Sequence, residues 1–232
     1  MPTRYIGPQV ITLDDLKLGN EDQIPDPGDA RFAYRILAEG DSWFSIGAIP
    51  SSNLLFELGL PDAGIVVNIA YPGDTVEAMS FLSGNPDLRK MICDEQWAYA
   101  WNVILLSGGG NDIIAQAGKI IVKARKKTSR KAADWIDVPL LDKLVAGVQD
   151  CYRNVVALRD TPGSVNADVP ILTHTYDYVT PRNAPAKFCF AGIAGPWFLP
   201  ALEAVGAPAR VHVPIAKYVI DRLAEGLLTL AQ

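Results

Sequence analysis

Four short apolar runs, each followed by glycine and polar residues, limit the fold of this chain more than any other feature. They are AYRILAEGDS (33–42), GIVVNIAYPGD (64–74), AWNVILLSGGGND (100–112) and VPILTHTYDY (169–178). Strands that are apolar at nearly every position are buried on both faces, and such strands occur mainly in parallel sheets. We therefore predict that the four runs form parallel strands, each ending in a turn.

The segments between these runs carry helix signals. We expect helices at 51–60, which opens with a serine suited to capping, at 75–82, and at 142–160, where apolar residues recur at helical spacing. Strands that alternate with helices form βαβ units with right-handed crossovers. The predicted fold class is α/β, a three-layer α/β/α sandwich with a parallel, flavodoxin-like sheet.

The length of the chain favours one domain. A chain of 232 residues, 49% of them hydrophobic, can bury a single core, and no internal repeat divides the sequence. Residues 1–30 mix proline, glycine and acidic residues without periodicity, so we expect a surface arm there. The stretch 113–168 is long for a crossover and could serve as a lid or a dimer surface, which would allow a homo-oligomer.

Charge and hydropathy argue against two kinds of partner. A net charge of -5 and a pI near 5.0 disfavour a nucleic-acid surface, because neutralising phosphates needs clustered cations. The basic cluster at 123–131 is expected to be a solvated helix end or loop. No stretch approaches the ~18 to 20 apolar residues of a membrane span, and the N-terminus lacks a signal-peptide pattern. A cytoplasmic protein is the expectation.

Neither a metal nor a cofactor is expected. The three cysteines are far apart and in no CxxC or Cys/His spacing, so we predict free, buried thiols. Three aspartates, Asp41, Asp74 and Asp112, follow the predicted strands and could suggest a metal site. Short Asp side chains in turns more often bind nearby backbone N–H groups, so we expect these three to hold the turns in place.

Polar segments gather where the predicted strands end. The carboxyl ends of parallel strands meet at one edge of the sheet, and ligands bind beyond that edge. The segments that would share it are 40–42, 72–74, 109–112 and 174–177. We expect them to face one cleft.

Three residues in these segments could carry chemistry. Ser42 follows a strand and two turn-forming residues, which fits an exposed nucleophile and fits equally a helix cap or a turn serine. Asn111 follows three glycines, and its amide together with backbone N–H groups could form an oxyanion hole. The same glycine-rich turn could cradle phosphate, although it lacks the Walker and GxGxxG spacings. Gly73 could add a backbone donor or be only a turn glycine.

Together these blocks resemble the SGNH (GDSL-like) hydrolase family and its long GDSW-type members. Family members carry Gly-Asp-Ser on the first strand, a glycine after the second and Gly-x-Asn-Asp after the third. This sequence has GDSW (40–43), YPGDT (71–75) and GGND (109–112) in that order. The resemblance covers residues 33–112 and implies the SGNH hydrolase fold, an ester substrate, Ser42 as nucleophile, and Gly73 and Asn111 as oxyanion donors. The pocket-lining positions would be Asp41, Trp43, Gly110, His174, Tyr176 and Asp177.

The family's fourth block, Asp-x-x-His, is not found, and the chain has only two histidines. His212 precedes a predicted helix much as the family's base does, although Ala209 stands where the acid belongs. Alternatively, residues 211–231 form the amphipathic helix that precedes the final strand in long relatives, and the chain ends before its base. His174 ends the fourth strand, and it could act as a base, shape the pocket or be structural.

Three classes of function are compatible with these patterns. The first is a serine esterase that acts on a small-molecule ester through an acyl-enzyme on Ser42, without a cofactor. The second is a non-catalytic or truncated SGNH-like module that lacks its general base and binds a carbohydrate or acyl ligand. The third is a nucleotide or phosphate binder that uses the turn at 109–112.

Overall fold

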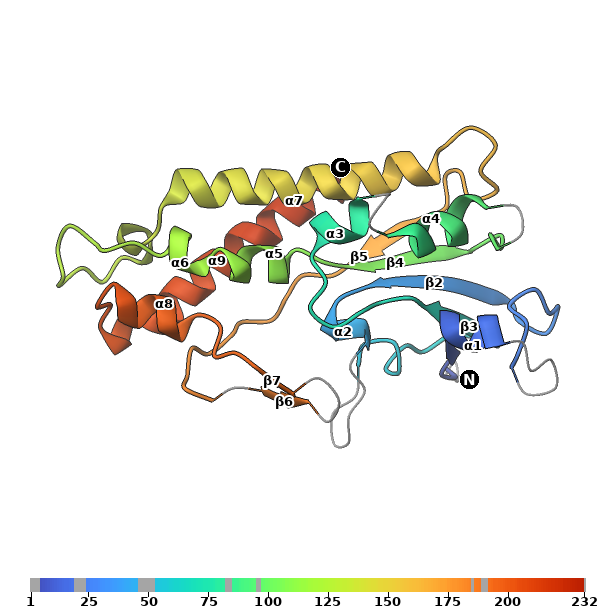
Figure 1. The fold of residues 1–232 in the computed structure, drawn as a ribbon, viewed down its shortest axis with the longest axis horizontal. Coiled ribbons are helices and arrows are strands. Elements are labelled where there is room, and N and C mark those ends of the chain that lie inside the picture. Colours follow the sequence, from blue (N-terminus) through green and yellow to red (C-terminus); the bar gives the residue numbers. More distant parts are fainter. Residues whose placement is uncertain are drawn as a thin grey trace. The chain divides into compact units, whose positions relative to one another are not determined.

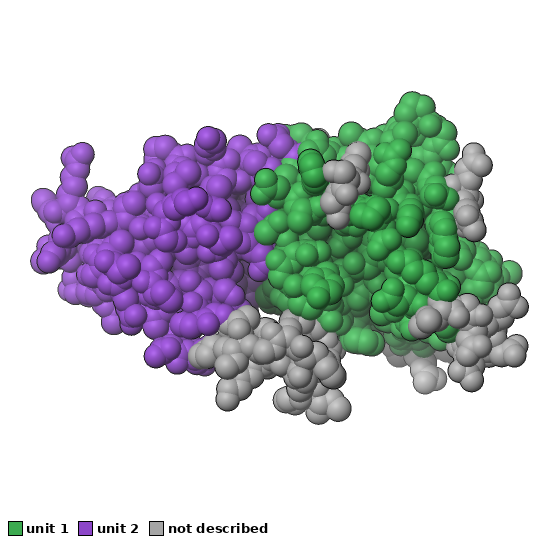
Figure 2. All heavy atoms as spheres, in the orientation of Figure 1, with its two compact units in different colours: residues 1–108, 151–174 green, residues 109–150, 175–232 purple. Residues whose placement is uncertain are grey.

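A computed structural model of the protein describes residues 5–18, 24–45, 53–81, 85–94, 97–184, 186–188 and 192–231. The chain groups into two compact units, shown in Figure 2. The first unit consists of residues 1–108 and 151–174, and the second of residues 109–150 and 175–232. The single domain expected from the sequence stays a prediction, because compact units of this kind also form within one domain.

The first unit contains a five-stranded parallel sheet with flanking helices (Figure 1). Its order is β1-β3-β2-β4-β5, and each neighbouring pair is parallel. The strands are β1 (Gln9–Thr12), β2 (Tyr34–Gly40), β3 (Gly64–Asn68), β4 (Val103–Ser107) and β5 (Ile171–Thr173). The predicted α/β class and all four predicted strands are confirmed. Without the edge strand β1, the order is β3-β2-β4-β5, which corresponds to the 2-1-3-4 order of flavodoxin-like sheets. The direction in which strands are added therefore reverses beside β2.

Helices occur in both units. The first unit contains α1 (Leu13–Leu18), α2 (Ser42–Ser45), α3 (Val76–Ser80) and α4 (Pro86–Cys93). The second contains α5 (Gly110–Ala115), α6 (Ala117–Ile120), α8 (Leu199–Ala204) and α9 (His212–Leu228), together with the antiparallel pair β6 (Ala186–Phe188) and β7 (Gly192–Ala194). Helix α7 (Val138–Arg159) contributes residues to both units. The helices predicted at 75–82, 142–160 and 211–231 are confirmed as α3, α7 and α9.

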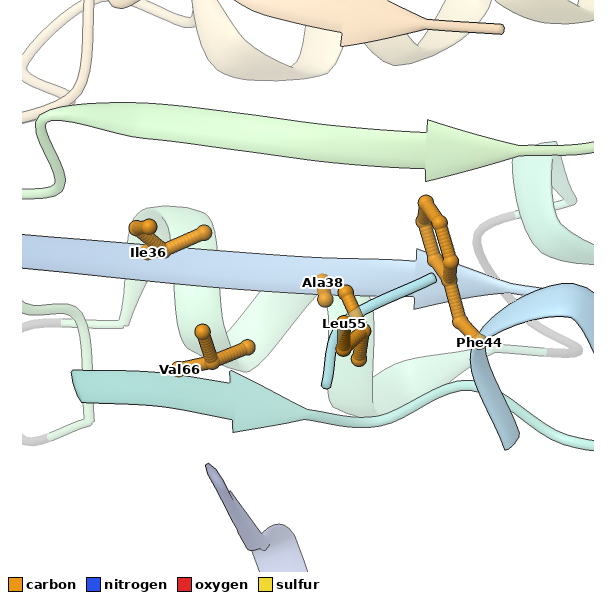
Figure 3. Packing of buried hydrophobic residues seen from close by; sticks show 5 residues of the cluster. All are labelled: Ile36, Ala38, Phe44, Leu55 and Val66. Atoms are coloured by element: carbon orange, nitrogen blue, oxygen red, sulfur yellow. The ribbon is translucent and has the colours of Figure 1, made fainter. Parts of the chain in front are cut away.

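The core of the first unit forms on the central strands. Successive residues Val66 and Val67 of β3 are both fully buried, which confirms that this strand is covered on both faces. Five buried side chains form one cluster beside β2 and β3 (Figure 3). They are Ile36, Ala38, Phe44, Leu55 and Val66. Because Phe44 belongs to α2, the cluster anchors the short helix that begins at Ser42.

The surface arm expected over residues 1–30 is wrong in one respect, because Gln9–Thr12 form the edge strand β1. Val10 is in register with Val66, and Ile11 with Val67, while Ile11 itself is buried. A strand of four residues is too short to give a clear period in the sequence. The strand forms because β3 offers it an edge to pair with, and not because of a local sequence pattern.

The helix expected at 51–60 is also wrong over the residues described there, 53–60. Residues 54–57 form a turn, in which Asn53 Oδ1 accepts the backbone N–H groups of Leu55 and Phe56. Leu60 then exchanges two backbone hydrogen bonds of 2.9 Å with Ile6 in an antiparallel bridge. This bridge holds the segment extended, so a distant pairing overrides the local helix signal. Residues 51 and 52 lie outside the described residues.

Other expectations concern thiols, the basic cluster and membrane spans. Among the described residues Cys93 and Cys151 form no disulfide bond, and both are half-buried rather than buried, while Cys189 lies outside those residues. All six basic side chains of the cluster at 123–131 are exposed in a loop, as predicted. Within the described ranges, no helix is both long enough and apolar enough to cross a bilayer.

Candidate functional site

Ser42 lies directly after the central strand β2 and is the first residue of α2. Its side chain is half-buried, and within the described part of the chain its hydroxyl has no hydrogen-bond partner. The capping role belongs to Asp41, whose Oδ1 accepts the Trp43 N–H at 3.0 Å and whose carbonyl oxygen accepts the Phe44 N–H at 3.1 Å. The alternative of Ser42 as a helix cap is therefore not what the structure shows.

The glycine of Gly-Asp-Ser is required by close packing. Gly40 is in register with Ser107 on β4, and a Cβ at Gly40 would lie 2.7 Å from Ser107 Cβ and 2.9 Å from its carbonyl oxygen. Carbon atoms do not approach this closely without displacement of the backbone. The Asp41 N–H then donates to the Ser107 carbonyl at 3.1 Å, which extends the strand pairing into the turn. The ends of β2 and β4 are thus locked together.

Hydrogen bonds link three side chains across these strand ends. The Ser107 hydroxyl lies 2.8 Å from Asp41 Oδ1 and 2.8 Å from Nε2 of His174, which follows β5. Asp41 is 1% exposed and Ser107 is fully buried, so this part of the network lies away from water, whereas His174 is half-buried. The His174 ring also packs against the rings of Trp43 and Phe44, with centroids 5.7 Å apart in both cases. Hydrogen bonds inside such a network are stronger than in water.

The loop after β3 carries Gly73 to the same strand ends. The Tyr71 N–H donates to the Gly40 carbonyl oxygen at 2.9 Å. Gly73 has φ +90, a left-handed conformation that other residues adopt only with strain. Burial and then the charge of Asp41 raise the pKa of Asp74. Among the described residues, no group of three histidine, cysteine, aspartate or glutamate side chains could hold a metal ion.

Glu39 is a buried carboxyl group that the sequence reasoning missed. It is 1% exposed on β2, and its oxygens accept the Gly40 N–H at 2.8 Å and Asn85 Nδ2–H at 2.8 Å. Burial is the main cause that raises the pKa of Glu39 to about 8, and the charges of Asp74 and Asp87 add to it. The signal was present in the sequence, because Glu39 is a charged residue inside an otherwise apolar run.

The other predicted site residues belong to the second unit. Asn111 is the second residue of α5. A Cβ at Gly110 would lie 2.7 Å from Tyr176 Cε1, so these two predicted pocket residues are in contact. Asp177 is exposed, and its Oδ1 accepts the N–H of the next residue at 2.7 Å.

His212 is the first residue of α9, and its Nε2 lies 2.8 Å from the Ala207 carbonyl oxygen. Because a carbonyl oxygen only accepts, Nε2 donates. The structure thus brings Asp41, Trp43 and His174 together in the unit of Ser42, and places His212 in the other unit. The roles of Gly73 and Asn111 in holding an oxyanion stay predictions.

The second unit has a pocket of about 440 Å³. Its wall includes Trp197, which is 43% exposed, and Phe198, which is buried. Thr180 and Arg182 add polar groups to the same wall.

Comparisons with known proteins give one weak likeness. No protein-family model matches the sequence, and no curated protein matches it. A solved structure of a mutant acetyl-xylooligosaccharide esterase from Geobacillus Stearmophilus resembles the chain with a TM-score of 0.36 and 16% identity. The alignment covers 84% of this chain and 73% of that one. A likeness at this level establishes neither a family nor an activity for the chain.

Proposed function

We propose that the protein is a carboxylic ester hydrolase that works through an acyl-enzyme on Ser42. The observation that carries the proposal is the placement of Ser42 at the carboxyl end of the central strand, with a hydroxyl that has no hydrogen-bond partner in the described residues. A serine held in a tight turn without a structural role of its own is suited to be a nucleophile. The order of the motifs GDSW, YPGDT and GGND supports the same assignment.

The proposed reaction has two halves. Ser42 Oγ attacks the ester carbonyl carbon while a histidine takes its proton, and the carbonyl electron pair moves onto the oxygen. The backbone N–H groups of Ser42 and Gly73 and the side-chain amide of Asn111 stabilise that oxyanion. Loss of one such donor costs roughly 100- to 1,000-fold in rate. The alcohol leaves with the proton, and water then releases the acid from Ser42.

A fluorophosphonate probe tests the nucleophile, because it reacts covalently with activated serines. We expect stoichiometric labelling at Ser42, and hydrolysis of p-nitrophenyl acetate that Ser42→Ala abolishes. Ser45→Ala is the matched control, because Ser45 lies on the same helix and its hydroxyl donates to the Asp41 carbonyl oxygen at 2.8 Å. Labelling that persists in Ser42→Ala, or a wild-type protein that neither labels nor hydrolyses, would contradict the proposal.

The pocket in the second unit favours a second candidate, a module that binds a carbohydrate or acyl ligand without chemistry. An exposed tryptophan on a pocket wall suits stacking against a sugar ring or an acyl chain. Titration of Trp197 fluorescence with xylo-oligosaccharides and with short fatty acids separates the candidates. Saturable binding by a protein whose Ser42 is inert would favour the module.

A further inference from the structure

The hydrogen bonds around Ser107 fix where the protons lie. The hydroxyl of Ser107 has one proton to give and two neighbours at 2.8 Å, Asp41 Oδ1 and His174 Nε2. Asp41 Oδ1 already accepts the Trp43 N–H, as a carboxylate oxygen does. Ser107 therefore donates to Asp41, and the remaining bond requires His174 Nε2 to be the donor. In a neutral ring with its proton on Nε2, Nδ1 is the basic atom.

We propose that Asp41 and Ser107 are positioning residues that hold His174 with its proton on Nε2, so that Nδ1 of His174 is the base that takes the proton of Ser42. The inference rests on the proposed function, which leaves the identity of the base open. In this proposal Asp41 has the orienting role that the aspartate has in a serine-hydrolase triad. The difference is that the Ser107 hydroxyl lies between the Asp41 carboxylate and the His174 ring.

Three observations favour His174 over His212. The first is place, because His174 belongs to the same compact unit as Ser42. The second is contact, because its ring packs on Trp43 and Phe44, the two residues that follow Ser42 on α2. The third is charge, because His174 is linked to a buried carboxylate through Ser107. In the described residues, His212 instead donates to a backbone carbonyl and has no carboxylate partner.

The proton and electron movements balance with these groups alone. As Ser42 Oγ bonds to the carbonyl carbon, its proton moves to Nδ1 and the ring becomes an imidazolium with protons on both nitrogens. Collapse of the tetrahedral intermediate breaks the bond to the alcohol oxygen, which takes the proton from Nδ1. In the second half, water gives a proton to Nδ1 as its oxygen attacks the acyl carbon. Ser42 Oγ then leaves and recovers that proton.

The role of the Asp41 charge can be tested by measuring how the rate of labelling depends on pH. A carboxylate connected through one hydroxyl stabilises the imidazolium that forms when Nδ1 takes the proton of Ser42. Asp74 interacts electrostatically with Asp41 from the loop after β3. Tyr152 of α7 hydrogen-bonds Thr173 Oγ1, beside His174, at 2.9 Å and is uncharged near neutral pH. Asp41→Asn removes the charge and keeps one acceptor oxygen for the Ser107 hydroxyl and the Trp43 N–H.

The test measures the rate of fluorophosphonate labelling of Ser42 across pH 5 to 9. In Asp41→Asn we expect the midpoint of the pH profile to move down and the plateau rate to fall by roughly 10-fold or more. Ser107→Ala should do the same. Ser80→Ala is the control, because Ser80 is also buried in the first unit but donates only to a backbone carbonyl. Profiles of Asp41→Asn and Ser107→Ala that coincide with the wild type would overturn the proposal.

Substitution of the two histidines decides between them. His174→Gln should slow labelling by roughly 100-fold or more. The inference is overturned if His212→Gln shows that loss and His174→Gln does not.

Nitrogen NMR of the His174 ring separates this inference from the proposed function. The Nε2–H tautomer should be observed in the wild type, and its population should fall in Ser107→Ala. If Ser42 does not label but this tautomer pattern is found, the esterase proposal fails and the positioning by Asp41 and Ser107 stands. A wild-type ring with its proton on Nδ1 would overturn the inference whatever Ser42 does.

Discussion

Asp41 and Ser42 are neighbours in the sequence, but they differ in their hydrogen bonds and in their burial. Asp41 caps α2, binds Ser107 and is almost fully buried. Ser42 contributes none of these contacts. Within Gly-Asp-Ser, the first residue is glycine because there is no room for a side chain, the second holds the turn, and the third is the proposed nucleophile.

The difference predicts unequal stability costs for two substitutions. Ser42→Ala should change the free energy of unfolding by about 0.5 kcal/mol or less, since the Ser42 hydroxyl has no hydrogen-bond partner among the described residues. Asp41→Ala should cost about 2 to 4 kcal/mol, because it removes the acceptor of the buried Ser107 hydroxyl and of the part-buried Trp43 N–H. Urea denaturation followed by circular dichroism measures both. Equal costs would show that the network around Asp41 does not stabilise the turn.

The sequence predicted some of these residue roles and missed others. The expectation that aspartates hold the turns is confirmed for Asp41, because that role depends on N–H groups close by in the chain. The part played by Ser107 could not be predicted, since its partners Asp41 and His174 are 66 and 67 residues away. A single serine at the end of an apolar strand gives no sign of such contacts.

Helices α7 and α9 show at the level of elements how packing decides the effect of a glycine. A Cβ at Gly226 on α9 would lie 2.2 Å from Val145 Cγ1 on α7, whereas a Cβ at Gly147 on α7 would meet nothing within 4 Å. Gln149 of α7 also donates to the Gly226 carbonyl oxygen at 2.8 Å. The two helices are therefore in close contact within the second unit.

Alanine at these two glycines should have opposite effects. Gly147→Ala should stabilise the protein by about 1 kcal/mol through helix propensity. Gly226→Ala should destabilise it by about 1 to 3 kcal/mol, because the added methyl group overpacks the contact with Val145. Adding Val145→Ala should recover part of that loss, and thermal unfolding of the three variants measures each change. A stabilising Gly226→Ala would mean that the helices separate at no cost.

Elements were predictable where the local pattern and the global fold agree. The four central strands and helices α3, α7 and α9 have long or clear periodicity, and all are present. Strand β1 and the turn at 54–57 were not predicted, because each depends on a distant segment, β3 in one case and Ile6 in the other. The side chains of Asp41, Ser107 and His174 join the ends of β2, β4 and β5, and that these ends form a functional site stays a prediction.

For the whole molecule, Glu39 makes stability depend on pH. Its pKa rises from 4.5 to about 8 on folding, chiefly because of burial. Between these values the folded state keeps a proton that the unfolded chain has released, so unfolding releases a proton and higher pH favours it. The contribution to stability is fully present below about pH 4.5, falls as pH rises, and levels off above about pH 8. Within that window the loss is at most about 1.4 kcal/mol per pH unit.

Glu39→Gln tests this linkage. Gln carries no charge at any pH, so the stability difference between wild type and variant should shift in favour of the variant as pH rises from 5 to 8. A constant offset is expected in addition, because the Gln amide offers one acceptor oxygen to two donors, the Gly40 N–H and Asn85 Nδ2–H. Urea denaturation at several pH values gives the slope. Parallel curves would show that Glu39 titrates alike in the folded and unfolded states.

Strand β1 has a consequence for how the protein is made. It precedes β2 and β3 in the chain and so leaves the ribosome before them, yet in the described sheet it pairs with β3 alone. It must therefore wait unpaired while β2 and β3 are synthesised. Its short length and the exposed polar residues Gln9 and Thr12 offer little to a wrong partner during that delay. On this side the sheet is built outward from β2, so β1 takes its place only after β3, which is translated later, has been added.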